Sequence, residues 1–310
     1  MKRIAFLFPG QGSQAVGMGR ELFDSSSLAR EIFVRADESL GYKLSSLCFE
    51  GPENELMLTQ NTQPALLTVS YIAFSVFGVN PFIAAGHSLG EYSALVAAGS
   101  LSFEDALLLV HRRGKYMQEA VPVGQGAMAA ILGIEYKKVE ECLKKINSGI
   151  VEIANWNSKE QIVISGDKDA VEEAIDLINS PRSVILPVSA PFHCSLMRSA
   201  EEKLSYDLDC VEFKDLELPV ITNVDAKIIH KGNEARDALK RQVTRTVLWY
   251  KSMEVLLEEK VDVCIEMGPG RVLSGLIQRT CREWTYPPLI LQIGDSESLE
   301  KCKEALSGGF

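Results

Sequence analysis

The 310-residue sequence lacks several features by which whole classes of protein are recognised. Its seven cysteines are odd in number and scattered, without a Cys-x-x-Cys pair. This pattern favours reduced, buried thiols over a disulfide framework or a cysteine-based metal site. No uninterrupted apolar run reaches the roughly 18 residues needed to cross a bilayer, so no membrane partner is expected. The formal net charge of −10 at pH 7 argues against a nucleic-acid partner.

The N-terminus also lacks a complete secretory signal. Residues 2–9 are basic and then apolar, but the apolar part is short, and Gly10-Gln11-Gly12 stands where a small-residue cleavage site is needed. We therefore predict a first buried strand at 4–8 and a cytoplasmic protein. The glycine-rich segment has neither the Lys-Ser/Thr of a P-loop nor a Gly-x-Gly-x-x-Gly pattern, so it is not expected to bind nucleotide phosphates.

What the chain does contain is an alternation of buried strands and amphipathic helices. It runs from the N-terminus to about residue 122 and resumes at residue 190. The expected strands are at 4–8, 82–85, 219–222, 261–266 and 288–292, and the expected helices at 28–40, 64–77, 103–120, 195–206, 234–244, 252–259, 272–280 and from 296 on. Such alternation predicts an α/β fold with a mostly parallel sheet covered on both faces.

The middle of the chain has a different order of elements. Strands are expected at 127–132, 149–154, 161–165 and 183–188, and helices at 136–146 and 167–178, with Asp167 as an N-cap. Read in order this is β-α-β-β-α-β, the ferredoxin-like motif. We therefore predict an α/β-hydrolase-like catalytic domain of residues 1–122 and 190–310 that carries an inserted ferredoxin-like subdomain of residues 123–189.

Ser88 lies in Gly86-His87-Ser88-Leu89-Gly90, between an expected strand and a helix-like stretch at 91–98. Strand, Gly-x-Ser-x-Gly and helix together form a nucleophile elbow, in which a strained turn lifts the serine hydroxyl clear of the sheet edge. Glycines are needed there because a Cβ would collide with the neighbouring strand or helix. The five-residue pattern alone is common by chance, and the flanking elements make Ser88 the candidate nucleophile.

A serine hydroxyl needs a neighbouring base at neutral pH, and the chain has four histidines. His193 is the best candidate, because it follows an expected strand in a proline-rich loop, where catalytic groups gather in open α/β sheets. His87 either packs in the turn or has a minor site role, His111 is solvated or packs against a helix, and His230 is a surface residue. No acidic residue between Ser88 and His193 stands out, which favours a dyad whose imidazole is oriented by a backbone carbonyl.

Arg112 and Arg113 lie together on the expected helix at 103–120. Two arginines on a largely apolar helix are usually solvated. The alternative is that one of them faces the pocket and binds a substrate carboxylate through two parallel N–H groups, a task suited to guanidinium geometry.

Several motifs, in order between residues 4 and 280, together resemble the malonyl-CoA:acyl-carrier-protein transacylases of the free-standing, fatty acid synthesis type. They are Phe8-Pro9-Gly10-Gln11-Gly12-Ser13-Gln14, Asn61-Thr62-Gln63-Pro64-Ala65, Gly86-His87-Ser88-Leu89-Gly90-Glu91-Tyr92, Arg113-Gly114, Met117-Gln118, Gly126-Ala127-Met128-Ala129-Ala130, Asn155, Gln161-Ile162-Val163-Ile164-Ser165-Gly166, Pro191-Phe192-His193-Cys194-Ser195-Leu196-Met197 and Gly268-Pro269-Gly270.

The resemblance implies a ping-pong acyl transfer. Ser88 attacks the malonyl thioester of malonyl-CoA while His193 takes its proton. The backbone N–H groups of Gln11 and Leu89 hold the oxyanion, and Arg113 pairs with the free malonyl carboxylate. The acceptor is the phosphopantetheine thiol of an acyl carrier protein.

The same resemblance assigns further residues. The backbone carbonyl of Gln242 orients the catalytic histidine, and Gln63 and Asn155 lie near the pocket. Phe192 narrows the space beside the malonyl α-carbon, which implies a preference for malonyl over methylmalonyl. No metal and no cofactor beyond the substrate's coenzyme A are implied, and the family's free-standing members suggest a monomer.

Because carrier proteins are acidic and this chain is too, docking requires a local basic rim around the site. The candidates are Lys115, Arg182, Arg198, Lys240, Arg241 and Arg271.

Two other functions are compatible with parts of the sequence. A serine thioesterase or esterase would use Ser88 and His193 with water as acceptor, and would give Arg113 no required role. A non-catalytic protein that binds acyl carriers would have no need of both Ser88 and His193. The motifs leave the choice between fatty acid and polyketide synthesis open.

Overall fold

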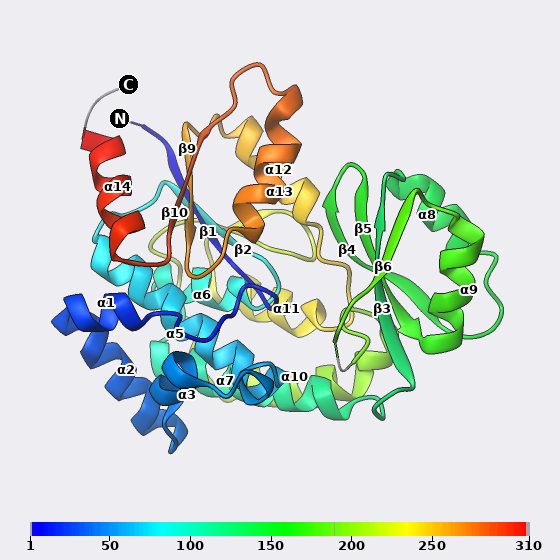
Figure 1. Ribbon diagram of the computed structural model, residues 1–310, viewed down its shortest axis with the longest axis horizontal. Coiled ribbons are helices and arrows are strands. Elements are labelled where there is room, and N and C mark those ends of the chain that lie inside the picture. The colour runs from blue at the N-terminus through cyan, green and yellow to red at the C-terminus, as the bar shows by residue number, and fades with distance from the viewer. Residues whose placement is uncertain (1, 189, 308–310) are drawn as a thin grey trace.

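The computed structural model describes residues 2–188 and 190–307, which build two sheets lying side by side (Figure 1). The larger sheet has the strand order β10-β9-β1-β2-β7-β8. Its strands are β1 (Ile4–Phe8), β2 (Ile83–Gly86), β7 (Val220–Ile221), β8 (Ile228–Ile229), β9 (Val263–Met267) and β10 (Leu289–Ile293). All neighbours pair in parallel except β8, which is antiparallel to β7. The predicted α/β fold with a parallel sheet is confirmed.

Side chains on β1 alternate between two apolar cores, and this explains why helices cover both faces of the sheet. Phe6 and Phe8 pack in one core with side chains of α2, α5, α6 and α7, whereas Ala5 and Leu7 pack in the other with side chains of α12 and α13. These helices are α2 (Ser27–Leu40), α5 (Thr59–Phe77), α6 (Gly90–Ala97), α7 (Phe103–Glu119), α12 (Trp249–Glu258) and α13 (Val272–Thr280).

The remaining helices outside the smaller sheet connect or flank these elements. They are α1 (Arg20–Ser25), α3 (Leu44–Glu50), α4 (Glu53–Leu56), η1 (Ser195–Met197), α10 (Arg198–Asp209), α11 (Gly232–Gln242), η2 (Cys281–Glu283) and α14 (Ser296–Ser307). Among the described residues, no helix combines the length and apolar character needed to cross a membrane.

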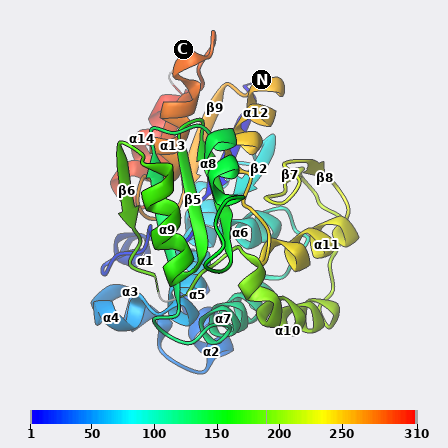
Figure 2. The same ribbon diagram turned by 90° about the vertical axis from the view of Figure 1, so that its right-hand side faces the viewer.

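The smaller sheet is antiparallel, with the order β4-β5-β3-β6. Its elements follow as β3 (Gly126–Leu132), α8 (Tyr136–Leu143), β4 (Val151–Ser158), β5 (Gln161–Asp167), α9 (Lys168–Ile178) and β6 (Arg182–Ile185). This is the predicted β-α-β-β-α-β order. Helices α8 and α9 cover the face turned away from the larger sheet, as Figure 2 shows, and enclose a separate apolar core. The boundaries at 123 and 189 stay a prediction, and residue 189 lies outside the described residues.

Helix α5 is longer than predicted, because Pro64 lies inside it and does not begin it. A proline lacks the N–H that would bond to the carbonyl oxygen four residues earlier, here that of Gln60. The His111 ring on α7 compensates, since its Nδ1 lies 2.9 Å from the Gln60 carbonyl oxygen. Of the two readings of His111, packing against a helix is therefore the one that the structure shows.

Other local expectations were met only in part. Asp167 stands at the predicted N-cap position of α9, but its side chain makes no cap hydrogen bond and accepts instead from the backbone N–H of Ile150. The expected strand at 183–188 ends at Ile185, shortly before Pro187, which has no N–H to continue the ladder. The short helices α1, α3 and α4 were not predicted, because four to seven residues are too few to reveal a helical period.

Candidate active site

Ser88 lies at the carboxyl end of β2, in the sharp turn that leads into α6, with a positive φ of 52°. Both flanking glycines are required by packing. A Cβ on Gly86 would collide with the backbone of Gly90, and a Cβ on Gly90 with the carbonyl of Phe8. The turn is held from outside by Asn223, whose Oδ1 accepts from the Ser88 N–H at 2.7 Å and whose Nδ2 donates to the Gly86 carbonyl at 2.7 Å. This is the strained geometry of a nucleophile elbow.

His193 meets this turn from a loop more than a hundred residues later in the chain. Its Nε2 lies 2.7 Å from Ser88 Oγ, and its Nδ1 lies 2.9 Å from the backbone carbonyl oxygen of Gln242. A carbonyl can only accept, so Nδ1 carries the proton and Nε2 is the acceptor for the serine hydroxyl. The structure therefore brings together the two residues of the predicted dyad and the predicted orienting carbonyl.

The environment of His193 keeps its imidazole neutral. Burial, the positive charge of Arg113 and the neighbouring His87 together lower the pKa of His193 to about 3, against the raising effect of the hydrogen bond that Nδ1 donates to the Gln242 carbonyl. At neutral pH the ring is thus neutral, with its one proton on Nδ1, and Nε2 is free to take a second proton. This is the state that a general base needs before it acts.

Arg113 lies on α7 with only 1% of its surface exposed. Its Nη1 donates to Gln63 Oε1 at 2.9 Å, and its Nη2 donates both to Gln242 Oε1 at 2.9 Å and to Ser88 Oγ at 3.0 Å. Its Nε has no hydrogen-bond partner among the described residues, and no carboxylate there forms an ion pair with it. The buried guanidinium is therefore equipped to receive an anion beside the nucleophile. Its neighbour Arg112 instead bonds to Asp207 at 2.9 Å.

Gln242 links these groups through both ends of its side chain. While Oε1 accepts from Arg113, Nε2 donates to the Ser88 carbonyl oxygen at 2.9 Å and to Glu91 Oε2 at 2.8 Å. Glu91 also accepts from the backbone N–H of Asn223 at 3.0 Å. Burial raises the pKa of Glu91 to about 7, against the lowering effect of these hydrogen bonds and of Arg113.

The sequence reasoning missed Glu91 and Asn223. Both carried a recognisable signal. Glu91 is a carboxylate that opens an otherwise apolar helix-like stretch directly after the elbow, and Asn223 is a polar residue at the carboxyl end of a short expected strand.

The two N–H groups predicted to hold an oxyanion belong to Gln11, in the turn after β1, and to Leu89, next to the nucleophile. Neither N–H has a hydrogen-bond partner among the described residues. The carboxyl ends of the adjacent parallel strands β1 and β2 bring the two turns to the same edge of the sheet. The Gln11 side chain reaches Thr59 Oγ1 at 3.4 Å.

The other predicted pocket residues, Gln63, Phe192 and Asn155, differ in their contacts. Gln63 contacts Arg113 directly and is almost fully buried. Phe192 precedes His193 and packs in the apolar core of the larger sheet. Asn155 lies on β4, forms a bridge with Val247 and is 7% exposed, and its side chain has no hydrogen-bond partner among the described residues.

Strand β4 of the smaller sheet contacts three segments of the site. Glu152 accepts from the Ser195 N–H at 2.9 Å and from the Ser195 hydroxyl at 2.8 Å, two residues after His193. The backbone of residues 154 and 156 pairs with Val247, five residues after Gln242. Asn157 Oδ1 lies 2.8 Å from His87 Nε2, in the elbow itself. His87 is thus partly buried and packs in the turn, as one of its two readings proposed, whereas His230 is exposed, as predicted.

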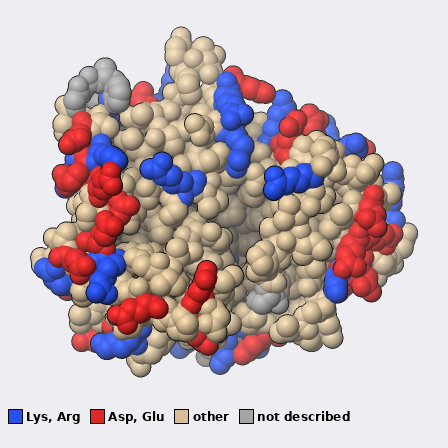
Figure 3. Space-filling model, in the orientation of Figure 1, with Lys and Arg blue, Asp and Glu red and all other residues tan. Residues whose placement is uncertain are grey.

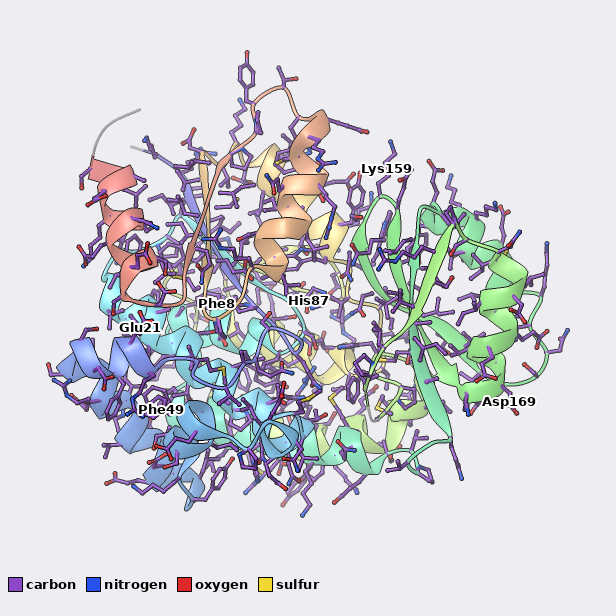
Figure 4. All side chains as sticks on the ribbon, in the orientation of Figure 1. Phe8, Glu21, Phe49, His87, Lys159 and Asp169 are labelled. Atoms are coloured by element: carbon purple, nitrogen blue, oxygen red, sulfur yellow. The ribbon has the colours of Figure 1, made fainter. Side chains whose placement is uncertain are left out.

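The site opens at the junction of the two sheets. In Figure 4, His87 lies between the larger sheet and the smaller one, beyond the end of β1 that is marked by Phe8. Figure 3 shows a hollow at the corresponding place, with Lys and Arg side chains above it and on both sides. A cavity of about 450 Å³ reaches His193 from the side of α8, lined also by Glu152 and the loop at 244–246. Among residues 2–188 and 190–307, no group of three or more His, Cys, Asp and Glu side chains could hold a metal ion.

Comparison with known proteins decides the family. The acyl transferase domain model matches residues 5–303 of this chain. The chain belongs to the acyl transferase domain family. It is an acyltransferase, and the resemblance read from the motifs is confirmed by its relatives. The malonyl CoA-acyl carrier protein transacylase of Bacillus subtilis (strain 168) is 46% identical over 314 residues, covering 99% of this chain and 98% of the relative.

Solved structures of acyltransferases share the fold. The malonyl CoA-acyl carrier protein transacylase from Coxiella burnetii has a TM-score of 0.93 and 40% identity, covering 97% of this chain and 96% of that one. A malonyl-transacylase solved in complex with its type II PKS acyl-carrier protein has a TM-score of 0.93 and 42% identity, covering 99% and 100%. Both structures match nearly the whole of this chain, and therefore both of its sheets.

Proposed function

We propose that this acyltransferase moves a malonyl group from malonyl-CoA to the phosphopantetheine thiol of an acyl carrier protein, through a malonyl-Ser88 intermediate. The observation that carries the proposal is the position of Ser88 Oγ, 2.7 Å from a neutral imidazole and 3.0 Å from a buried guanidinium. The first contact suits proton removal and the second suits a substrate with a free carboxylate.

In the first half-reaction, Ser88 Oγ attacks the thioester carbonyl carbon and its proton passes to His193 Nε2. The oxyanion accepts hydrogen bonds from the N–H groups of Gln11 and Leu89. When the tetrahedral intermediate collapses, the C–S bond breaks, and the proton on His193 passes to the leaving sulfur. Coenzyme A leaves as a thiol, and malonyl remains as an ester on Ser88.

The second half-reaction runs the same steps with the carrier thiol as nucleophile. His193 takes the thiol proton, the sulfur attacks the ester carbonyl, and the proton returns to Ser88 Oγ as the ester bond breaks. The carbonyl of Gln242 fixes the imidazole in the tautomer that both halves require. Side chains and backbone amides of the chain account for every proton and charge, so the proposal includes no metal and no cofactor beyond the substrate's own coenzyme A.

Hydrolysis is the alternative reaction, since a thioesterase would use the same dyad. Intact mass spectrometry of the protein with malonyl-CoA and a phosphopantetheinylated carrier protein separates the two. Malonyl on the enzyme and then on the carrier supports transfer. Free malonate with an unloaded carrier would make the chain a hydrolase. The buried Arg113 favours transfer, because it can hold the acyl group out of line with an attacking water.

Replacing Arg113 by alanine should weaken malonyl transfer and relax the selectivity for charged acyl groups. Loss of charge-assisted hydrogen bonds to the carboxylate costs about 1.5–3 kcal/mol, which corresponds to a fall of roughly 10- to 100-fold in kcat/KM. Acetyl-CoA should be affected much less. Steady-state kinetics with both substrates measures the change, and malonyl kinetics equal to those of the wild type would remove Arg113 from the mechanism.

Phe192 should limit the substituent on the malonyl α-carbon. We expect kcat/KM for methylmalonyl-CoA to be lower than for malonyl-CoA, by roughly tenfold or more for one methyl group in a tight site. Phe192→Ser should narrow this difference. Competition between the two substrates for a limiting amount of carrier protein measures it, and equal rates in the wild type would contradict the assignment.

Transfer to the carrier should depend on salt, because an acidic carrier must approach a chain of net charge −10. Of the six candidate basic residues, four pair with carboxylates, namely Lys115, Arg198, Lys240 and Arg241. The exposed Arg182 and Arg271 form no ion pair among the described residues, so they are the best docking candidates. Their replacement by Ala should raise KM for the carrier without changing acylation by malonyl-CoA. An absence of any salt effect would rule out electrostatic docking.

The remaining expectations are part of the same proposal. The partner is a carrier protein, in line with the complex of a similar malonyl-transacylase with its type II PKS acyl-carrier protein. We further propose that the chain acts as a monomer in the cytoplasm, with neither a nucleic acid nor a membrane as a partner.

A further inference from the structure

Arg113 uses both hydrogens of its Nη2 in this structure. One goes to Gln242 Oε1 at 2.9 Å and the other to Ser88 Oγ at 3.0 Å. Nη1 donates one hydrogen to Gln63 at 2.9 Å, and Nε donates to no described residue. Two N–H groups are therefore left for a ligand, one on Nη1 and one on Nε.

These two N–H groups cannot bind a carboxylate together. A guanidinium presents parallel pairs of N–H groups only between Nη1 and Nη2 and between Nε and Nη2. Both pairs include Nη2, whose hydrogens are occupied. A carboxylate that binds Arg113 through two parallel hydrogen bonds must therefore displace Gln242 or Ser88 from Nη2.

Of the two partners of Nη2, Gln242 cannot move away from Arg113, because its side chain is fixed by other hydrogen bonds. Its side chain is fully buried, and its Nε2 is held by the Ser88 carbonyl oxygen at 2.9 Å and by Glu91 at 2.8 Å. Its backbone carbonyl also holds His193. The Ser88 hydroxyl, in contrast, accepts from Nη2 through an oxygen lone pair, while its own O–H donates to His193 Nε2, so loss of the Nη2 hydrogen leaves the hydrogen bond of the dyad in place.

We propose that Arg113 holds the nucleophile in a less reactive state through the hydrogen bond from its Nη2 to Ser88 Oγ, which we call the latch. The malonyl carboxylate releases the latch by accepting this Nη2 hydrogen in place of Ser88 Oγ. The inference rests on the proposed function and adds to it the way in which the acyl group is selected. With Arg113 latched, a lone pair of Oγ is occupied by a cationic donor and is less available for attack. Selection against uncharged acyl groups then acts on the rate of acylation as well as on binding.

The positive charge of Arg113 also disfavours acylation as long as no carboxylate is bound, because it makes His193 a weaker base. It is one of the groups that lower the pKa of His193, together with burial and the ring of His87. A bound carboxylate neutralises that charge, so the imidazole becomes a stronger base when the charged substrate is present. The bond changes of acylation are the same as before, since the carboxylate exchanges hydrogen bonds and forms no covalent bond.

The test compares malonyl-CoA with acetoacetyl-CoA, in which a methyl group replaces one carboxylate oxygen. The two acyl groups match in shape, and only malonyl is charged. Rapid-quench acylation of Ser88 at saturating substrate should be at least about tenfold slower with acetoacetyl-CoA, the factor expected for one hydrogen bond to a charged group. Equal saturating rates with a difference in KM alone would overturn the latch.

Acylation by acetoacetyl-CoA could also be slow because the neutral acyl group binds in a wrong position. Variants of Arg113 distinguish this explanation from the latch. In Arg113→Met the acetoacetyl rate should rise above that of the wild type while the malonyl rate falls, so that the two converge. Arg112→Met removes a neighbouring charge that contacts Asp207 and should keep the wild-type difference. An acetoacetyl rate in Arg113→Met no higher than in the wild type would also overturn the latch.

A substitute variant and the malonyl reaction of the wild type distinguish failure of the latch from failure of folding or of the proposed function. If Arg113→Met fails to fold, as judged by circular dichroism, Arg113→Gln serves in its place under the same criteria. If malonyl-CoA gives no acyl-Ser88 in the wild type, the proposed function itself fails. If malonyl acylation is normal and the neutral substrate reacts equally fast, only the latch fails.

Discussion

Ser88→Ala should lower malonyl transfer by roughly 10⁴-fold or more and leave no malonyl on the protein. Ser88 Oγ is the atom that accepts from Arg113 and donates to His193, so its removal deletes the nucleophile while both partners keep their other hydrogen bonds. The measurement is the initial rate of carrier malonylation, together with the intact mass of the enzyme after exposure to malonyl-CoA. Binding of malonyl-CoA should persist, because the contacts of Arg113 with Gln63 and Gln242 remain.

Ser93→Ala is a matched control for this change. Ser93 lies on α6, one and a half turns from the elbow, is buried, and its hydroxyl has no hydrogen-bond partner among the described residues. Its replacement should leave transfer close to the wild-type rate. A Ser88→Ala enzyme that still transfers malonyl within tenfold of the wild type would require a different nucleophile.

His193→Ala should slow acylation of Ser88 by roughly 10³-fold, within the range reported for loss of a general base. The pH dependence of the wild type tests the environment of the same residue. A base acts only above its own pKa, and the pKa of His193 is lowered to about 3 by burial and by Arg113. The acylation kcat/KM should therefore show no fall due to His193 as the pH drops from 8 to about 5.

His230→Ala provides the control, since this histidine is exposed and directly follows β8. It should leave both the rate and the pH profile unchanged. A fall in the wild-type acylation kcat/KM centred near the ordinary histidine pKa of about 6.5, absent from a variant without His193, would contradict the buried, neutral imidazole.

Most of the fold could be predicted from the sequence because its elements are long and periodic. The strand around Phe6 is a continuous apolar run, typical of a parallel strand buried on both faces, and α7 shows a regular helical spacing of apolar residues. Pro64 misled the prediction of α5, since the compensating donor, His111, belongs to another helix. Such a replacement of a missing backbone donor is a tertiary event, which local sequence does not reveal.

The candidate site also contains residues that the sequence reveals and residues that only the tertiary structure reveals. Ser88 and His193 carry local signals, a glycine-bounded turn and a proline-rich loop, and reasoning from these residues alone reached a serine and histidine acyl-transfer enzyme. The position of Arg113 required the family resemblance, because Arg112 beside it is chemically identical and faces Asp207 instead. Glu91 accepts from the backbone N–H of Asn223, and the side chains of both residues accept from Gln242 Nε2. Contacts among residues so far apart in the chain leave no pattern in the sequence.

The three contacts that β4 makes with the site limit how far this protein can be treated as interchangeable modules. Glu152, Asn157 and the backbone beside Val247 connect the smaller sheet to the loop of the base, the turn of the nucleophile and the segment that follows Gln242. A recombinant chimera that exchanges the smaller sheet with α8 and α9 would place a foreign β4 against native catalytic loops. Successful grafting would therefore have to transplant β4 and its three contact segments as a unit, which makes them the indivisible block for recombination within this family.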